Sequence, residues 1–148
     1  MISLQSQEFL EPQISDYIIS AEKVAHVQVG NSLEHALLVL TKSGYSAIPV
    51  LDARFKLHGL ISSAMITESI LGLERIEFEK LSEKKVEDVM NRDIPILSID
   101  DHFEKAIDLL VDHPFLCVAD HEGYFEGIFT RRVLLQQLQI HVHKLNHF

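Results

Sequence analysis

The chain has little of several features that would direct its interpretation. Its 148 residues include a single cysteine, Cys117, so no disulfide can form within the chain. Because Cys117 stands inside an apolar run, we expect a buried thiol and not a reactive one. No apolar run approaches the roughly 20 residues that cross a bilayer, and the N-terminus lacks the basic and apolar regions of a secretory signal. We therefore expect a cytoplasmic protein without a membrane span.

Basic charge and catalytic signatures are scarce as well. The formal net charge is −9, which argues against DNA or RNA as a partner because neutralising phosphates requires a basic face. A local cluster of cations would still suit a small anion. There is no Gly-rich phosphate loop and no recognisable nucleophile elbow. His141, His143 and His147 could gather near the C-terminus, but no cysteine or carboxylate joins them at zinc-like spacing. We expect no enzyme activity, no cofactor and no metal.

What the chain does contain is an internal repeat. At a constant offset of 70, the apolar positions of residues 24–40 match those of residues 94–110. After a contraction of two residues the match resumes, with 48–52 over 116–120 and 58–62 over 126–130. Apolar residues make up 47% of the chain and aromatic residues 7%, so a mostly aliphatic core is expected. A chain of this length is sufficient for one domain with its own core.

Each repeat predicts the order β-α-β-β-α. A strand (24–29, 94–99) leads to polar helix caps at Asn31 and Ser32, and at Asp100 and Asp101. Apolar residues at i, i+3, i+4 and i+7 then form one buried helix face. These residues are Leu33, Ala36, Leu37 and Leu40 in the first repeat and Phe103, Ala106, Ile107 and Leu110 in the second. Gly44 is a plausible end of the first helix. Two strands (47–51 and 57–61; 115–119 and 124–129) precede closing helices that begin near Ser62 and Thr130.

The predicted organisation is an N-terminal segment (1–13), a first repeat (14–72), a connector (73–85), a second repeat (86–138) and a tail (139–148). The connector is charged but keeps four apolar residues: Leu73, Ile76, Phe78 and Leu81. Two interpretations remain open for it, a solvated connector or a docking surface for a partner.

From about Ile14 to Leu138 the chain resembles tandem cystathionine-β-synthase-type (CBS) domain pairs. The segments 16–18 and 88–90 are similar to the Asp-hydrophobic-Met opening of such repeats, and each repeat closes with Gly, two apolar residues and Ser or Thr. The segments 23–30, 72–81 and 125–132 are similar to the stand-alone CBS-pair proteins of low-GC Gram-positive bacteria that bind cyclic di-AMP. The resemblance implies an α/β fold with two interleaved three-stranded sheets, packed as one pseudo-two-fold domain, and a flat homodimer.

The resemblance also implies that a nucleotide binds in a cleft between the repeats. The first site would use Lys23, Val24 and Ala25, then Tyr45, Ser46 and Ala47, and finally Thr130, Arg131 and Arg132. Small residues would admit a flat base, an aromatic ring can stack on it, and two arginines at a helix start suit phosphates. Tyr45 and Lys23 could equally be ordinary surface residues, and the arginine pair a solvated helix start. The second site (94–96, 115–117 and 62–65) is mostly apolar, and we expect it to be empty.

One departure from the family pattern concerns the ligand. Nucleotide-binding CBS repeats often close with Ser/Thr-x-x-Asp, whose carboxylate holds a ribose diol, but Met65 and Val133 occupy those positions here. A cyclic dinucleotide has no free diol, so we hypothesise a preference for cyclic di-AMP. By resemblance, protein partners would be a (p)ppGpp synthetase/hydrolase and pyruvate carboxylase. The alternatives are an AMP, ADP or ATP sensor and a ligand-free structural dimerisation module.

Overall fold

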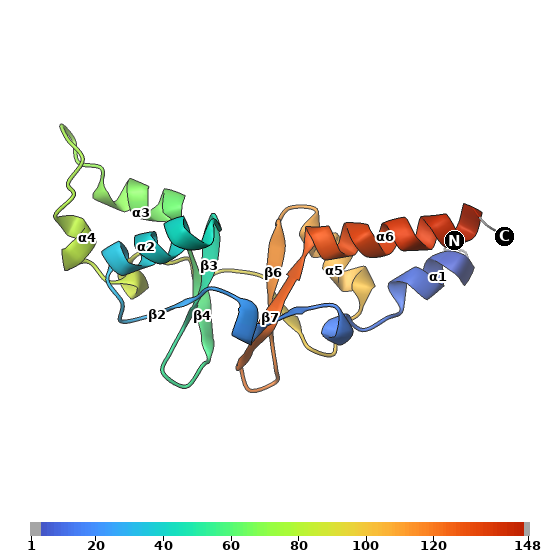
Figure 1. The fold of residues 1–148 in the computed structure, drawn as a ribbon. Helices are drawn as coiled ribbons and strands as arrows, with labels where there is room; N and C mark the ends of the chain where they lie inside the picture. Colours follow the sequence, from blue (N-terminus) through green and yellow to red (C-terminus); the bar gives the residue numbers. More distant parts are fainter. Residues whose placement is uncertain (1–3, 147–148) are drawn as a thin grey trace. The chain divides into compact units, whose positions relative to one another are not determined.

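The order strand, helix, strand, strand, helix occurs twice in the computed structural model, which describes residues 4–146 (Figure 1). The first set is β2 (Val27–Gln28), α2 (Leu33–Ser43), β3 (Ala47–Leu51), β4 (Leu57–Ser62) and α3 (Ser63–Ile70). The second set is β5 (Ile96–Ser98), α5 (Phe103–Leu110), β6 (Phe115–Ala119), β7 (Phe125–Thr130) and α6 (Arg131–Asn146). Before both sets come α1 (Leu4–Leu10) and β1 (Ile19–Ser20), and α4 (Lys80–Glu83) lies between the sets. The predicted α/β fold class is confirmed.

Contacts divide the chain into two units. Unit 1 contains the described parts of Met1–Lys23, Pro95–Glu122 and Glu126–Phe148, and unit 2 contains Val24–Ile94 and Gly123–Phe125. The start of the predicted N-terminal segment (1–3) and the end of the predicted tail (147–148, with His147) lie outside the described residues. The predicted boundaries between repeats and connector stay a prediction. No helix within residues 4–146 is long and apolar enough to cross a membrane.

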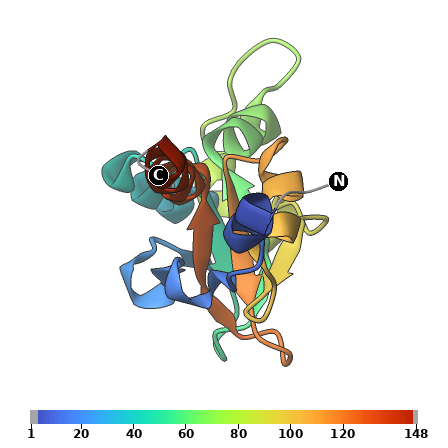
Figure 2. The same cartoon turned by 90° about the vertical axis from the view of Figure 1, so that its right-hand side faces the viewer.

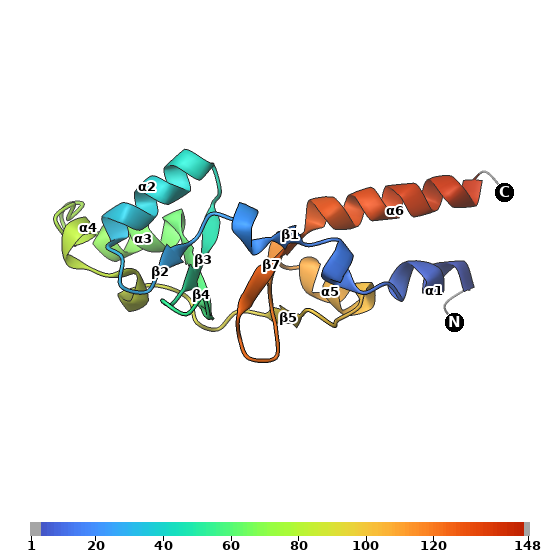
Figure 3. The same cartoon turned by 60° about the horizontal axis from the view of Figure 1, so that its bottom comes forward.

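Unit 2 is built on the three-stranded sheet β2-β3-β4, in which β2 runs parallel to β3 and β4 antiparallel to it. Helices α2 and α3 lie on the same side of this sheet (Figures 1 and 3). The predicted face of α2 is confirmed, because Leu33, Ala36 and Leu40 are buried and Leu37 is half-buried. They pack in a core that consists of Val27, Leu33, Ala36, Leu40, Ile48, Val50, Ile61, Ile66, Val86 and Met90.

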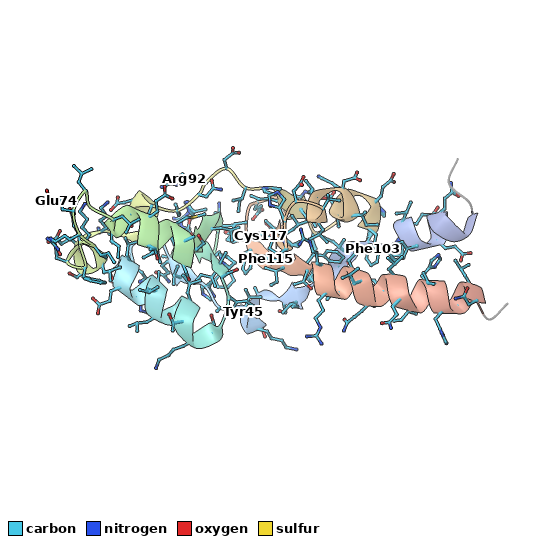
Figure 4. All side chains as sticks on the ribbon, turned by 90° about the horizontal axis from the view of Figure 1, so that it is seen from above. Tyr45, Glu74, Arg92, Phe103, Phe115 and Cys117 are labelled. Carbon is cyan, nitrogen blue, oxygen red and sulfur yellow. The ribbon has the colours of Figure 1, made fainter. Side chains whose placement is uncertain are left out.

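Unit 1 is built on a sheet with the strand order β1-β7-β6-β5. The resemblance implied three strands, and the fourth arises because Ile19 and Ser20 pair with β7 in antiparallel orientation. Phe103 of α5 lies at the centre of the core (Figure 4), with ring centroids 5.6 Å from Phe9, 5.0 Å from Tyr17 and 5.5 Å from Phe129. Aromatic rings at such edge-on distances contribute beyond their buried area.

Cys117 of β6 behaves as predicted. It is 1% exposed, and burial raises the pKa of its thiol to about 12. The thiolate form that reacts with electrophiles is therefore scarce at neutral pH.

The segments that open the repeats are exchanged between the two sets. In unit 1, the Ile14 N–H donates to the Asp101 carbonyl at 3.0 Å. In unit 2, the Val86 N–H donates in the same way to the Asn31 carbonyl at 2.8 Å. In return, the Phe103 N–H at the start of α5 donates to the Pro12 carbonyl at 3.1 Å, and the Leu33 N–H at the start of α2 donates to the Lys84 carbonyl at 3.0 Å. The segment that opens each repeat thus completes the helix start of the other set.

Three of the predicted helix caps are confirmed. The hydroxyl oxygens of Ser32, Ser62 and Thr130 each accept a bond at 3.1 Å from the backbone N–H three residues later. These bonds satisfy N–H groups that have no partner inside the helix. Gly44 ends α2 with φ 79°, a conformation that glycine adopts without strain.

Other predicted details are wrong. The first strand of each set covers only 27–28 and 96–98, because Ala21–Lys23 forms a short 3₁₀ turn and Pro95 has no N–H to donate to a ladder. The predicted cap at Asp100 and Asp101 is also wrong, since His102 is the N-cap and its side chain makes no capping bond. The Asp101 carboxylate instead accepts from the Ser98 N–H at 2.8 Å.

Candidate functional site

Two of the predicted site segments lie at the same end of the unit 2 sheet. The parallel register places Val27 opposite Val50. Ala47 is the first residue of β3, and Val24 lies three residues before β2, ahead of the same end of the sheet. Val24 is buried, and Ala25 is half-buried against the core. Their backbone therefore has a rigid support.

Tyr45 and Ser46 follow the left-handed turn at Gly44 that ends α2. The Tyr45 side chain is 41% exposed (Figure 4), so one face of its ring is available for stacking. Ser46 is exposed, but its carbonyl already accepts from the Ser63 N–H at 3.1 Å. Ala47 is half-buried as the first residue of β3.

Thr130 ends β7 and caps α6 in unit 1. Its hydroxyl accepts from the Val133 N–H, and no acidic side chain stands in the first helical turn. The start of a 16-residue helix carries a partial positive charge. This end of α6 is therefore suited to an anion.

The guanidinium of Arg131 already has partners in the protein. Its Nε donates to the Leu110 carbonyl at 2.7 Å and its Nη2 to the Val111 carbonyl at 3.0 Å. The Arg131 backbone N–H also donates to the Pro114 carbonyl at 3.0 Å. Arg131 thus ties the start of α6 to the C-terminal end of α5. Its predicted phosphate contact stays a prediction.

Arg132 and Lys23 are the two other predicted cations of the site. Both are exposed, and within the described residues neither makes an ion pair or a hydrogen bond. A cation in the first turn of a helix is disfavoured by the helix dipole. An anionic ligand would offset that repulsion at Arg132.

The predicted site draws on both units. Unit 2 holds Val24, Ala25, Tyr45, Ser46 and Ala47, whereas unit 1 holds Lys23, Thr130, Arg131 and Arg132. Each group of residues is described within its own unit, and the cleft that would combine the two groups stays a prediction. The same holds for the second site, whose segments 94–96, 115–117 and 62–65 also belong to both units.

Sequence reasoning missed an aromatic contact made by His26, the residue after Ala25. The His26 ring lies edge-on to Phe55, with centroids 5.3 Å apart. Phe55 has φ 69°, which is strained for an aromatic residue, and its carbonyl accepts from the Phe125 N–H at 3.0 Å. A hydrogen bond from the first residue of β7 holds this conformation, and because β7 is distant in the sequence, the residues around Phe55 carried no signal for it.

Asp52, in the same turn, carries a perturbed carboxylate. His58 Nε2 lies 2.8 Å from Asp52 Oδ2, and the backbone N–H groups of Lys56 and Arg54 also donate to the carboxylate. These hydrogen bonds, that of His58 first, lower the pKa of Asp52 to about 2. Within residues 4–146, no three His, Cys, Asp or Glu side chains form a group that could hold a metal ion.

Comparison with known proteins places these features in a family. A sequence profile of the CBS domain matches residues 14–72 and 86–139, which is more than half of the chain. The chain belongs to the CBS domain family, and the predicted resemblance is confirmed.

Within the CBS domain family, the chain is similar along most of its length to individual bacterial proteins. Over 146 residues the chain is 58% identical to "Cyclic di-AMP receptor B" of Bacillus subtilis (strain 168), with 99% of both chains covered. The crystal structure of Listeria monocytogenes CbpB protein in complex with c-di-AMP superposes with a TM-score of 0.83 and 64% identity, covering 88% of this chain and 97% of that one. A CBS domain-containing protein from Bacillus anthracis superposes with a TM-score of 0.84 and 63% identity, covering 90% of this chain and 96% of that one.

Proposed function

We propose that this chain is a non-enzymatic receptor that binds cyclic di-AMP and thereby controls its binding to partner proteins. The observation that carries the proposal is the 58% identity, across 99% of both chains, to a protein named cyclic di-AMP receptor B. Likeness of this extent indicates the same fold over the compared residues. The proposal also places the receptor in the cytoplasm and assigns it no metal and no nucleic acid partner.

The residues of this chain support a ligand with phosphates and flat bases. Tyr45 offers a half-exposed ring to a base, and Arg132 offers a guanidinium at the start of α6 that has no partner among residues 4–146. The proposed contacts are Lys23, Val24, Ala25, Tyr45, Ser46, Ala47, Thr130, Arg131 and Arg132. Met65 and Val133 stand where a diol-binding Asp would select AMP or ATP. Because an apolar side chain cannot accept hydrogen bonds from a diol, these positions favour the cyclic dinucleotide.

The test is isothermal titration of the full chain with cyclic di-AMP, with AMP, ATP and cyclic di-GMP in parallel. Selective binding of cyclic di-AMP near one per chain is expected. Tighter or equal binding of AMP or ATP would favour an energy sensor instead. No heat and no change of melting temperature with any of the four nucleotides would leave a structural dimerisation module.

Dimerisation is part of the proposal, and α6 supports it. The side chains of Leu135, Leu138, Val142 and Leu145 are between 40% and 60% exposed. Their spacing of three, four and three residues forms a seam like that of paired helices. The double substitution Leu138→Glu with Val142→Glu is expected to convert a dimer into a monomer in light scattering, because it would bury charges against apolar side chains.

Control of a partner requires that ligand and partner favour different states or compete for one surface. By family resemblance, the proposed partners are a (p)ppGpp synthetase/hydrolase and pyruvate carboxylase. We expect the nucleotide-free dimer to bind the partner and cyclic di-AMP to weaken that complex. A pull-down with purified candidates, with and without the nucleotide, tests this expectation, and equal recovery in both conditions would contradict it.

A further inference from the structure

The connector between the two sets carries an apolar surface. Four large side chains are exposed within eight residues: Leu71 at 54%, Leu73 at 106%, Ile76 at 43% and Phe78 at 64%. We call residues 71–78 the connector hairpin. It follows α3 in unit 2, and Figure 2 shows it as a light green loop that projects from that helix. Contiguous exposed apolar side chains of this kind mark binding surfaces more often than scattered ones do.

The connector hairpin is held in one conformation by its own backbone. Leu71 and Ile76 form an antiparallel bridge, and the Gly72 N–H donates to the Arg75 carbonyl at 2.8 Å. The Glu77 N–H donates to the Ile70 carbonyl at 2.7 Å. The apolar side chains are thus presented by an ordered loop, so a partner would lose little binding energy to ordering it.

The base of the hairpin is joined to the core of unit 2. Leu81 of α4 is half-buried against that core, and the Lys84 N–H donates to the Lys80 carbonyl at 2.9 Å. The connector is therefore more than a solvated link. Its first half is exposed and apolar, whereas its second half packs on the protein.

The charges around the hairpin are mostly acidic. Arg75 forms a two-bonded ion pair with Glu79, and Lys80 Nζ lies 2.5 Å from Glu77 Oε2. Glu74, beside the fully exposed Leu73, is exposed and has no ion pair within the described residues (Figure 4). The cations are thus neutralised, and the remaining charge at the tip is negative. Pairing of two copies through their tips would bring two Glu74 carboxylates together, which is repulsive.

We propose that the connector hairpin is the docking site for a partner protein that has an apolar pocket bordered by Lys or Arg side chains. Leu73 and Phe78 would enter the pocket, and Glu74 would face the basic border. Interfaces are dominated by a few such buried side chains, and charges at the border set partner choice. The inference rests on the proposed function in one respect, that the chain acts through a partner protein.

The experiment uses the full chain in the cells from which it comes. A photoreactive benzophenone amino acid replaces Leu73, and in a control it replaces Val111, which is 71% exposed in unit 1. The protein cross-linked at position 73 is identified, purified and titrated with the wild-type chain and three variants. We expect Leu73→Ser with Phe78→Ser, and separately Glu74→Lys, to weaken binding at least about tenfold, while Val111→Ser leaves it unchanged. Higher salt should weaken wild-type binding, because the charges at the border are screened.

Three outcomes would overturn the inference. Cross-linking at position 73 could be no stronger than at position 111, it could capture only a second copy of this chain, or the captured protein could bind the double variant as tightly as the wild type. Because Leu73 is fully exposed and Phe78 is 64% exposed, the double variant is expected to melt close to the wild type. Titration with cyclic di-AMP separates the two proposals: a wild-type chain that ignores the nucleotide but loses its partner in the double variant contradicts the receptor function only.

Discussion

The two arginines at the start of α6 are expected to respond differently to replacement by alanine. Arg131 donates to the Leu110 carbonyl at 2.7 Å and to the Val111 carbonyl at 3.0 Å. Hydrogen bonds from a charged group contribute about 1.5–3 kcal/mol when they are sheltered. Because Arg131 is exposed, we expect Arg131→Ala to lower the free energy of unfolding by about 1–2 kcal/mol in total. For a chain of this size, that corresponds to a fall in melting temperature of roughly 2–8 °C.

Arg132 has no hydrogen bond or ion pair within the described residues, so Arg132→Ala should leave the melting temperature unchanged. If its guanidinium holds a phosphate of cyclic di-AMP, the lost charge-assisted bond is worth about 1.5–3 kcal/mol. The affinity would then fall roughly 10- to 150-fold. Arg132→Ala therefore changes binding without changing stability.

The assays are thermal melting without ligand and isothermal titration with cyclic di-AMP, on the same preparations. Arg131→Lys serves as the matched control, because an ammonium keeps the charge but lacks the planar fork that reaches both carbonyls. Its melting temperature should lie between those of the wild type and Arg131→Ala. The reasoning is refuted if Arg131→Ala melts as the wild type does, or if Arg132→Ala melts lower and binds with unchanged affinity.

Three further results are expected. Gly127→Ala should lower the free energy of unfolding in urea by about 2 kcal/mol or more, because the new Cβ would lie 2.1 Å from the Ile19 carbonyl oxygen of β1 and the residue has φ 152°. In the control Gly30→Ala the new Cβ meets nothing within 4 Å, and the loss should be less than about 0.5 kcal/mol. Similar losses in the two variants would contradict this reasoning. The Cys117 thiol, with its pKa raised to about 12, should react with a disulfide reagent at pH 8 only after unfolding, and rapid reaction of the native protein would count against it. Hydrogen bonding, chiefly to His58, lowers the folded pKa of Asp52 to about 2, so its contribution to stability is present above the unfolded pKa of about 4 and is lost as the pH falls toward 2. The stability difference between wild type and Asp52→Asn should shrink across that range, and a constant difference would show that the hydrogen bonds to the Asp52 carboxylate are not its source.

Sequence reasoning was most accurate where neighbouring residues decide the structure. The bounds of β3 and β6 agree with the prediction, since each is a short apolar run of mostly buried residues between turn signals. The caps at Ser32, Ser62 and Thr130 are also local, because each hydroxyl reaches an N–H only three residues away. The prediction was wrong at Asp101, because its carboxylate accepts from the Ser98 N–H and not from an N–H group of the following helix.

The candidate site shows the same division. Its residue types and its likeness to CBS pairs are readable in the chain, because they depend on motifs and on the internal repeat. The sequence does not reveal that Arg131 donates two hydrogen bonds to the end of α5, because Leu110 and Val111 are some 20 residues away. From the sequence alone, an arginine at this position is equally suited to donate to a phosphate or to backbone carbonyls.

The sequence by itself determined the family, the β-α-β-β-α order, the buried helix faces and the caps at Ser32, Ser62 and Thr130, because periodicity and short-range hydrogen bonds depend on neighbouring residues. Only the tertiary structure decided that Ile19 and Ser20 add a fourth strand to one sheet, and that the opening segment of each repeat completes the helix start of the other. It also decided that the connector hairpin (71–78) exposes four apolar side chains, whereas Leu81 packs against the core. These features depend on contacts between residues that are distant in the sequence, and the pattern of neighbouring residues does not predict such contacts.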